Sequence, residues 1–283
     1  HTKGVNEIMT LRNFKWRNLY LWLVFIVLYA PIIFLVVYSF SQGTTMNNFH
    51  GFTWQHYQDL FADSRLIAIF LDTILIALLS SLLATIIGTL GALGINSTTK
   101  PITRNTLLSL NNILMVSPDV IIGASFLIFF TALKIPLGFG SVLLSHIAFS
   151  IPIVVLMVLP KIQEMSSSLL DAAADLGANN WQLLSQIIVP YIMPGIFSGF
   201  FMALTYSLDD FAVTFFVTGN GFSTLSVEIY SRARQGINLE INALSGLMFL
   251  MALVLVIGYY FINQYSSRHR RPAVRGRRKW KNY

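Results

Sequence analysis

Six long apolar segments dominate this chain of 283 residues. Each one has the length of roughly 20 residues that a helix needs to cross the hydrocarbon core of a bilayer. The segments cover residues 19–40, 66–95, 107–133, 142–159, 196–217 and 241–262. We therefore predict an all-α, polytopic membrane protein with six transmembrane helices.

Composition points to the same class, because 55% of the residues are hydrophobic and 11% are charged, which leaves too little polar surface to cover a soluble globule. Lys and Arg accumulate on the cytoplasmic side of membrane proteins, so their positions predict the orientation. If both termini are cytoplasmic, the basic residues outside are Arg65, Lys134, Arg232 and Arg234, and those inside are Lys3, Arg12, Lys15, Arg17, Lys100, Arg104, Lys161 and the eight between 268 and 281. This asymmetry predicts a multi-pass protein with both termini in the cytoplasm.

The predicted organisation has three parts. Residues 1–18 form a cytoplasmic segment, residues 19–265 a six-helix transmembrane domain with a cytoplasmic loop at 161–190, and residues 266–283 a basic cytoplasmic tail. A basic tail also suits nucleic acid, but such a cluster just inside a last span is typical of contact with anionic lipid. We expect membrane lipid as its partner and no nucleic acid. The first span is too long for a signal peptide and lacks a small-residue cleavage site, so we expect a retained anchor.

The residues needed for disulfides, metal sites and nucleotide binding are missing or scattered. Cysteine is absent, which excludes disulfides and thiolate metal sites. The five histidines are scattered without i, i+4 pairing, so we expect no metal site. No G-x-x-x-x-G-K-[ST] motif occurs to cradle a nucleotide. We expect no catalytic residue and no cofactor in this chain, and any ATP and Mg²⁺ must be bound by a partner.

The loop at 161–190 is polar and predicts a helix, a glycine turn and a second helix. Ser168 and Asp171 have the spacing of a capping box at a helix start. Gly177 can adopt the left-handed conformation that ends a helix, and an Asn at 179 or 180 can cap the next one. Pro190 should bend or end that second helix. Such a unit, amphipathic and too short to span a bilayer, is suited to docking at the membrane surface.

Four acids lie within or at the edges of the predicted spans: Asp72, Asp119, Asp209 and Asp210. An Asp at the centre of a spanning helix costs about 2.5 to 3.5 kcal/mol on insertion scales, and no Lys or Arg lies inside any span to pair with these acids. We predict that they face a cavity or one another, as a set of cation sites.

The fifth predicted span carries a polar stripe. Tyr206, Asp210 and Thr214 follow one another at spacings of four, and Asp209 lies about 100° away on the same helix. With Phe211 close by, carboxylates and aromatic faces suit an ammonium cation that has lost its water. The alternative is that Asp210 bonds Tyr206 and holds helices together.

The loop resembles the EAA motif of permease subunits of ATP-binding-cassette (ABC) importers. The matching positions are Asp171, Ala172, Ala173, Gly177, Ile187 and Pro190. Asp171 replaces the usual Glu and Val189 the usual Leu. The resemblance implies the type I (MetI-like) importer permease fold, a bacterial inner-membrane location and docking of an ATPase on this loop.

Further stretches are similar to spermidine/putrescine permeases of the type called C, namely SPDVIIGASFLIFF at 117–130, HIAFSIPIVVLMV at 146–158, SLDDFAVTFFVTG at 207–219, IYSRARQG at 229–236 and EINALS at 240–245. The resemblance implies a polyamine substrate, a second homologous permease subunit that completes the pore, two ATPase subunits that dock from the cytoplasm, and an external substrate-binding protein.

Alternatives from the residues stay open. Iron or thiamine importers belong to the same broad class, whereas the lack of intramembrane bases disfavours anions. An ion channel or proton-coupled carrier also uses intramembrane acids, but has no use for an ATPase docking loop. A membrane enzyme lacks a nucleophile or metal constellation here. The loop at 220–239, external in this orientation, carries an alternating run at 224–230 with β-branched residues. In it, Glu228 is a candidate contact for a cationic substrate or a lysine of the binding protein, and an ordinary solvated loop is the alternative.

Overall fold

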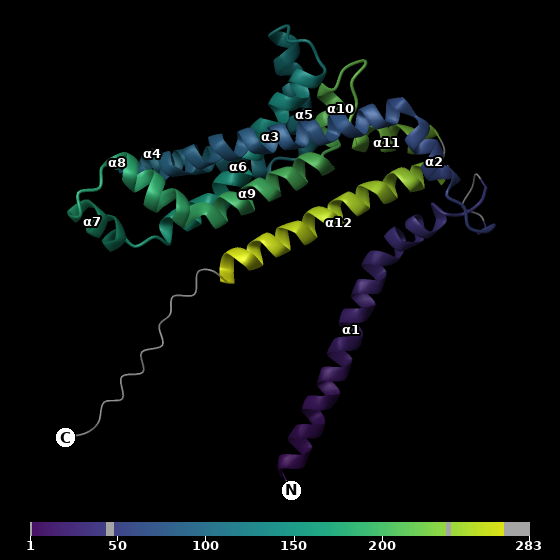
Figure 1. Ribbon diagram of the computed structural model, residues 1–283, viewed down its shortest axis with the longest axis horizontal. Helices are drawn as coiled ribbons and strands as arrows, with labels where there is room; N and C mark the ends of the chain where they lie inside the picture. Colours follow the sequence, from purple (N-terminus) through teal and green to yellow (C-terminus); the bar gives the residue numbers. More distant parts are fainter. Residues whose placement is uncertain (1, 44–47, 236–238, 269–283) are drawn as a thin grey trace. The chain divides into compact units, whose positions relative to one another are not determined.

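A computed structural model describes the backbone of residues 2–43, 48–235 and 239–268, and the side chains of these ranges between 18 and 261. The described chain is helical, with one isolated antiparallel bridge between Ser41 and Phe52 (Figure 1). The elements are α1 (Thr2–Tyr38), α2 (Gln55–Ala62), α3 (Ser64–Ser97), α4 (Pro101–Val116), α5 (Asp119–Ala132), α6 (Phe139–Gln163), α7 (Ser167–Asp175), α8 (Asn180–Gln182), the π-helical turn η1 (Leu183–Ile188), α9 (Val189–Asp209), α10 (Ala212–Val217), α11 (Leu225–Gln235) and α12 (Leu239–Arg268).

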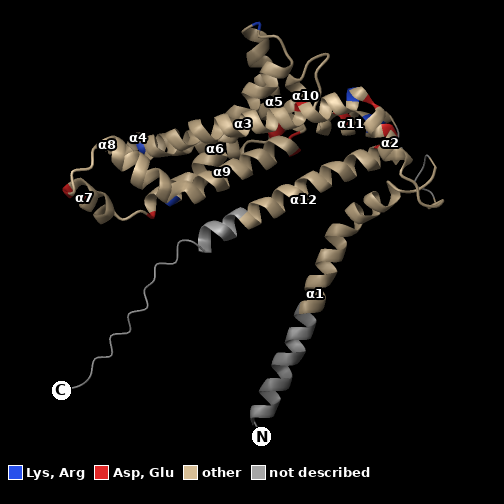
Figure 2. Ribbon diagram, viewed as in Figure 1, with Lys and Arg blue, Asp and Glu red and all other residues tan. Residues whose placement is uncertain are grey.

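Five helical segments in the described part of the chain are long and apolar enough to cross a membrane, and the number is six when a bent pair of helices is counted as one span. The five are Asn18–Tyr38, Ser64–Ser97, Phe139–Gln163, Asn180–Asp209 and Leu239–Phe261, and the pair is Pro101–Val116 with Asp119–Ala132. Among the described residues, the charged ones lie near the ends of the long helices, and the middles of these helices are uncharged, as a bilayer core requires (Figure 2).

The third predicted span, 107–133, is not one straight helix. The chain breaks at Ser117 and Pro118, and α4 and α5 differ in direction by 105°. Both residues are extended, with ψ of 139° and 134°. Proline disfavours the helical conformation of the residue before it and has no N–H to donate, so an apolar run with a Pro inside it breaks there.

The fifth predicted span, 196–217, is also divided. Its helix already starts at Asn180 and ends at Asp209, and α10 is a separate helix. Asp210 is extended, with φ −62° and ψ 119°. Its carboxylate accepts hydrogen bonds from the first turn of α10, a local alternative to helix continuation that Asp side chains often provide.

The chain forms two compact units. The larger unit comprises residues 69–227 and 252–283, and the smaller unit comprises residues 1–68 and 228–251. The expected single domain over 19–265 stays a prediction. The expected tail at 266–283 lies outside the described residues, apart from the backbone of its first three positions.

In the larger unit, α3, α6 and α9 lie side by side (Figure 1). Val154 of α6 is fully buried where the three helices meet. A Cβ on Gly88 of α3 would lie 2.7 Å from Val154 Cβ, and one on Gly199 of α9 would lie 3.2 Å from Val154 Cγ1. Close approach of these helices therefore depends on residues without a side chain, as is common between membrane helices.

In the smaller unit, a buried acid holds two bases. Glu228 of α11 accepts hydrogen bonds from Arg232 at 2.8 Å and from Arg65 at 3.0 Å. The strand-like run predicted at 224–230 is wrong, because α11 starts at Leu225. The Glu228–Arg232 pair spans i and i+4, the spacing at which a helix brings opposite charges together. The carboxylate that we considered as a cation contact is therefore already neutralised.

Candidate functional site

The loop at 161–190 forms the predicted helix, glycine turn and helix. Gly177 has φ +86° and ends α7. Its N–H donates to Ala174 O at 2.9 Å, and the N–H of Ala178 donates to Ala173 O at 3.1 Å. These two bonds form a Schellman motif, which satisfies the last carbonyls of a helix through a left-handed residue. The role of Gly177 as a helix stop is confirmed.

The predicted capping box at Ser168 and Asp171 is wrong. Helix α7 starts at Ser167, and the hydroxyl of Ser168 instead bonds that of Ser166 at 2.6 Å. The box occurs at the second helix, where Asn179 Oδ1 accepts from the Gln182 N–H at 2.9 Å and Gln182 Oε1 accepts from the Asn179 N–H at 2.8 Å. Of the two asparagines, position 179 is thus the cap.

Pro190 does not end the second helix. The helical segment continues from Asn180 to Asp209, and the turn before the proline, η1, is π-helical. There the N–H of Val189 bonds Leu184 O, five residues back. A proline inside an α-helix removes a hydrogen bond and clashes with the carbonyl four residues back, and the wider π turn changes that register. Ile187 lies half-buried in η1.

The first helix of this loop, α7, is largely exposed in the chain by itself. No residue of α7 is buried, Asp171 and Ala172 are exposed, and Ala173 is half-buried. Leu176 is 90% exposed and Trp181 72% exposed. In Figure 1, α7 and α8 lie together at one end of the long helices of the larger unit. A protruding element with large exposed apolar side chains is typical of a protein–protein contact.

A second site lies where the two broken spans meet, since α5 packs against α10. Asp119 is the exposed first residue of α5. Tyr206 of α9 donates a hydrogen bond of 2.7 Å to Asp119 Oδ1. The Tyr206 ring stands edge-on to Phe149 of α6, with centroids 5.0 Å apart. The structure therefore pairs Tyr206 with Asp119, where we had considered a bond to Asp210.

The adjacent acids Asp209 and Asp210 have opposite surroundings. Asp209 ends α9 and is exposed, whereas Asp210 is 8% exposed. The Asp210 carboxylate accepts from the Thr214 hydroxyl at 2.7 Å and from the N–H groups of Thr214 at 2.8 Å and Val213 at 3.3 Å. The predicted stripe through Tyr206, Asp210 and Thr214 is wrong, because the helix breaks at Asp210 and turns its carboxylate inward.

Sequence reasoning missed His146, which is buried beside Asp210. Its Nδ1 lies 2.7 Å from Ser207 Oγ, and its Nε2 lies 2.8 Å from Thr214 Oγ1 and 3.6 Å from Asp210 Oδ2. Ser207 Oγ lies 3.0 Å from Ser80 Oγ, so hydrogen bonds join α3, α6, α9 and α10. A lone histidine inside an apolar span is itself a signal that a polar partner lies nearby.

The remaining predicted residues stand apart from the Tyr206–Asp119 pair. Asp72 is half-buried on α3, and within the described residues no hydrogen bond or ion pair joins it to the other acids. Phe211 lies in the break after Asp210, with its ring 5.4 Å from that of Phe215. The described ranges hold no group of three metal-ligating side chains.

Comparison with known proteins covers most of the chain. Residues 84–272 match the model of the family described as binding-protein-dependent transport system inner membrane component. A spermidine/putrescine transport system permease protein of Haemophilus influenzae, PotC, is 34% identical over 247 residues, which cover 87% of this chain and 96% of the relative. A putrescine transport system permease protein of Escherichia coli, PotI, is 32% identical over 281 residues, 97% of this chain and 100% of the relative.

Among solved structures, a chain of a bacterial ABC transporter involved in the import of the acidic polysaccharide alginate has a TM-score of 0.70 at 20% identity, covering 95% of this chain and 99% of that one. This likeness shows the predicted fold, that of a type I ABC importer permease. The described helices and the family match together also show a multi-pass membrane protein. The chain belongs to the family of binding-protein-dependent transport system inner membrane components.

Proposed function

We propose that this chain is the permease subunit of an ATP-driven importer of polyamines such as spermidine and putrescine, and that it forms half of the translocation pathway. The observation that carries the proposal is the Tyr206–Asp119 pair at the meeting point of two broken spans, with Asp209 exposed at the end of α9. Broken helices that present carboxylates and helix C-termini are how several membrane carriers bind cations.

The charges of the site and the relatives both support a polyamine substrate. Polyamines carry several ammonium groups, which carboxylates and aromatic faces bind well. Asp119, Tyr206 and Asp209 are the pathway residues that we favour, together with Phe211 and Asp72 along the route. Asp210 supports the site from within, because its oxygens already hold α10 and its carboxylate lies beside His146. Both relatives described above carry the names of polyamine systems.

ATP would act through the exposed element formed by α7, α8 and η1. We infer that an ATPase subunit docks on Asp171, Ala172 and Ala173 and on the apolar side chains beyond Gly177, and that Ile187 and Pro190 transmit its motion into α9. The complete importer would hold a second homologous permease subunit, two ATPase subunits that bind ATP and Mg²⁺, and an external substrate-binding protein. The exposure of Leu176 supports this assignment.

The orientation that serves this function places both termini and the α7–α8 element in the cytoplasm of a bacterium, with the protein in the plasma membrane. The uneven distribution of Lys and Arg supports it. The basic tail then contacts anionic lipid of the inner leaflet.

Uptake of labelled spermidine and putrescine tests the proposal, in cells that lack their own polyamine importer and express this chain with its partner subunits. We expect ATP-dependent accumulation, and co-isolation of this chain with an ATPase. Uptake of iron or thiamine in place of polyamines would assign a different cargo. Ion conductance by this chain alone would refute the importer.

A further inference from the structure

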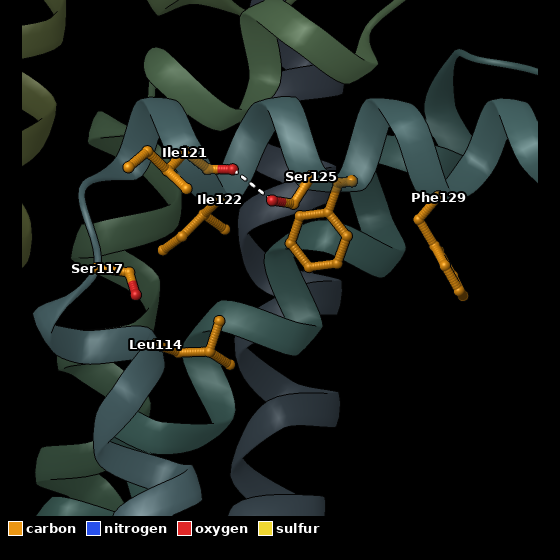
Figure 3. A pocket seen from close by; sticks show the side chains of 7 residues that line it. Leu114, Ser117, Ile121, Ile122, Ser125 and Phe129 are labelled. Atoms are coloured by element: carbon orange, nitrogen blue, oxygen red, sulfur yellow. Dashed lines mark hydrogen bonds between the residues drawn. The ribbon is translucent and has the colours of Figure 1, made fainter.

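A pocket opens at the bend between α4 and α5 (Figure 3). It has a volume of about 440 Å³, which lies within the range of about 300–1,000 Å³ that is usual for small-molecule sites. Six of the side chains that line it are Leu114, Ser117, Ile122, Ser125, Phe126 and Phe129. The 105° bend at Pro118 creates this space, because it turns α5 away from the axis of α4.

The surface of the pocket is apolar in spite of its two serines. Ser117 Oγ donates to Ile113 O at 2.7 Å, and Ser125 Oγ donates to Ile121 O at 2.7 Å. Each hydroxyl therefore satisfies its donor within its own helix, as the dashed line in Figure 3 shows for Ser125. No basic side chain lines the pocket. Its occupant should present hydrocarbon and carry no negative charge.

The pocket neighbours the candidate cation site through residues that pack against both. Asp119 precedes Ile122 by three positions and Phe126 by seven, so the acid shares their face of α5. Ile122 and Phe126 pack in one cluster with Phe149. The ring of Phe149 in turn supports Tyr206, the hydrogen-bond partner of Asp119. A carboxylate and an apolar wall thus meet within one packed group of residues.

We propose that this pocket binds the methylene chain of a polyamine whose ammonium group is held at Asp119 and Tyr206. The inference rests on the proposed function and assigns a binding site to the methylene groups, which carboxylates cannot recognise. A polyamine carries a run of methylene groups beside each charged nitrogen, and here an apolar pocket lies beside a carboxylate. Each methylene that leaves water contributes roughly a fourfold gain in affinity. The pocket therefore makes uptake depend on the length of the chain between the nitrogens.

The experiment fills the pocket and varies the substrate. In the assembled transporter with its binding protein, KM for uptake is measured for diamines with three, four and five methylenes, for wild type and for Ser125→Leu. The ratio of the variant KM to the wild-type KM cancels the preference of the binding protein, because that protein is the same in both. We expect this ratio to grow with chain length, by up to roughly fourfold for each methylene that is excluded.

Thr131→Leu is the matched control. Thr131 is also exposed on α5 and donates to the carbonyl four residues back, but it does not line the pocket. We expect its KM ratio to stay near one at every chain length. Phe129→Ala enlarges the pocket and removes part of its apolar wall, so we expect KM to differ less among the three diamines than it does in wild type. This variant tests the inference even if Ser125→Leu fails to assemble.

The outcomes separate the two proposals. Absence of polyamine uptake by the wild type refutes the proposed function. Normal wild-type uptake, with a KM ratio for Ser125→Leu that does not change with chain length, overturns only the methylene pocket. Loss of the second permease subunit from Ser125→Leu but not from Thr131→Leu would assign the pocket to subunit contact and would also overturn the inference.

Discussion

The phenol of Tyr206 donates a hydrogen bond of 2.7 Å to the carboxylate of Asp119, across a sequence separation of 87 residues. This bond joins α9 to the first turn of α5, so it links the two spans that are interrupted in this chain. It occupies one lone pair of a carboxylate that keeps others free for a cation. The pair thus serves both helix packing and the candidate substrate site.

Tyr206→Phe removes this hydrogen bond and keeps the ring that packs on Phe149. We expect uptake to fall several-fold and the folded protein to lose about 0.5–1.5 kcal/mol, the net contribution of one intramolecular hydrogen bond. Initial uptake rates and thermal melting of the purified transporter measure the two effects. Tyr259→Phe removes a longer bond of 3.3 Å to Ser198, and should leave uptake unchanged. Equal uptake defects in the two variants would argue against a specific role for the Tyr206–Asp119 pair.

Two variants test the different roles of the adjacent acids: Asp209→Asn removes a substrate contact, and Asp210→Asn changes a structural acid. Because Asp209 is exposed, we expect its variant to assemble, melt normally and hydrolyse ATP while uptake falls. Asp210→Asn weakens charge-assisted bonds to the start of α10, and should reduce stability by about 1–3 kcal/mol. Melting temperatures and uptake rates are measured side by side. If Asp209→Asn transports normally, its place in the pathway is lost.

Gly177→Val should uncouple ATP hydrolysis from transport or prevent ATPase assembly. At φ +86° a β-branched residue is strained by about 1–3 kcal/mol, so α7 loses the turn that sets its direction. The measurement is polyamine transported per ATP hydrolysed. Gly140→Val is the control, because Gly140 has no positive φ and no atom within 4 Å of its added Cβ. Coupled uptake at the wild-type ratio in Gly177→Val would count against the docking role.

Leu176→Ser tests the same contact without strain. The side chain is 90% exposed, so its loss should leave the stability of the isolated chain within about 0.5 kcal/mol of wild type. We expect weaker association with the ATPase, measured by co-purification. Leu133→Ser, at an exposed leucine just after α5, should associate normally. Unchanged association in Leu176→Ser would place the ATPase elsewhere.

Gly88→Ala should disturb the packing of α3 against α6. The new Cβ would lie 2.7 Å from the buried Val154 Cβ, and overpacking of this kind costs about 1–3 kcal/mol. Gly94→Ala, on the same helix with no neighbour within 4 Å, should be neutral or stabilising by up to about 1 kcal/mol. Thermal melting compares the two, and similar shifts would contradict the close approach.

Features of the fold that depend on neighbouring residues could be predicted from the sequence. The lengths of the first, second, fourth and sixth spans follow from apolar runs, the stop at Gly177 from the lack of a Cβ, and the second helix start from the amide at Asn179. Pro118 is also a local signal for a helix break, but the long apolar run around it led to the prediction of one continuous span. These features depend on residues a few positions apart, so they and the membrane class of the protein can be predicted from the sequence.

The surroundings of each intramembrane acid became visible in the folded chain alone. Asp209 and Asp210 look alike in the sequence, yet one is exposed and the other caps a helix beside His146. Tyr206 bonds Asp119, which is 87 positions away in the sequence, and not Asp210, which is four positions away. An acid within a span needs a partner or a cavity in either case. Whether an acid meets a partner or a cavity depends on where distant helices break and pack, and a local sequence pattern does not contain this information.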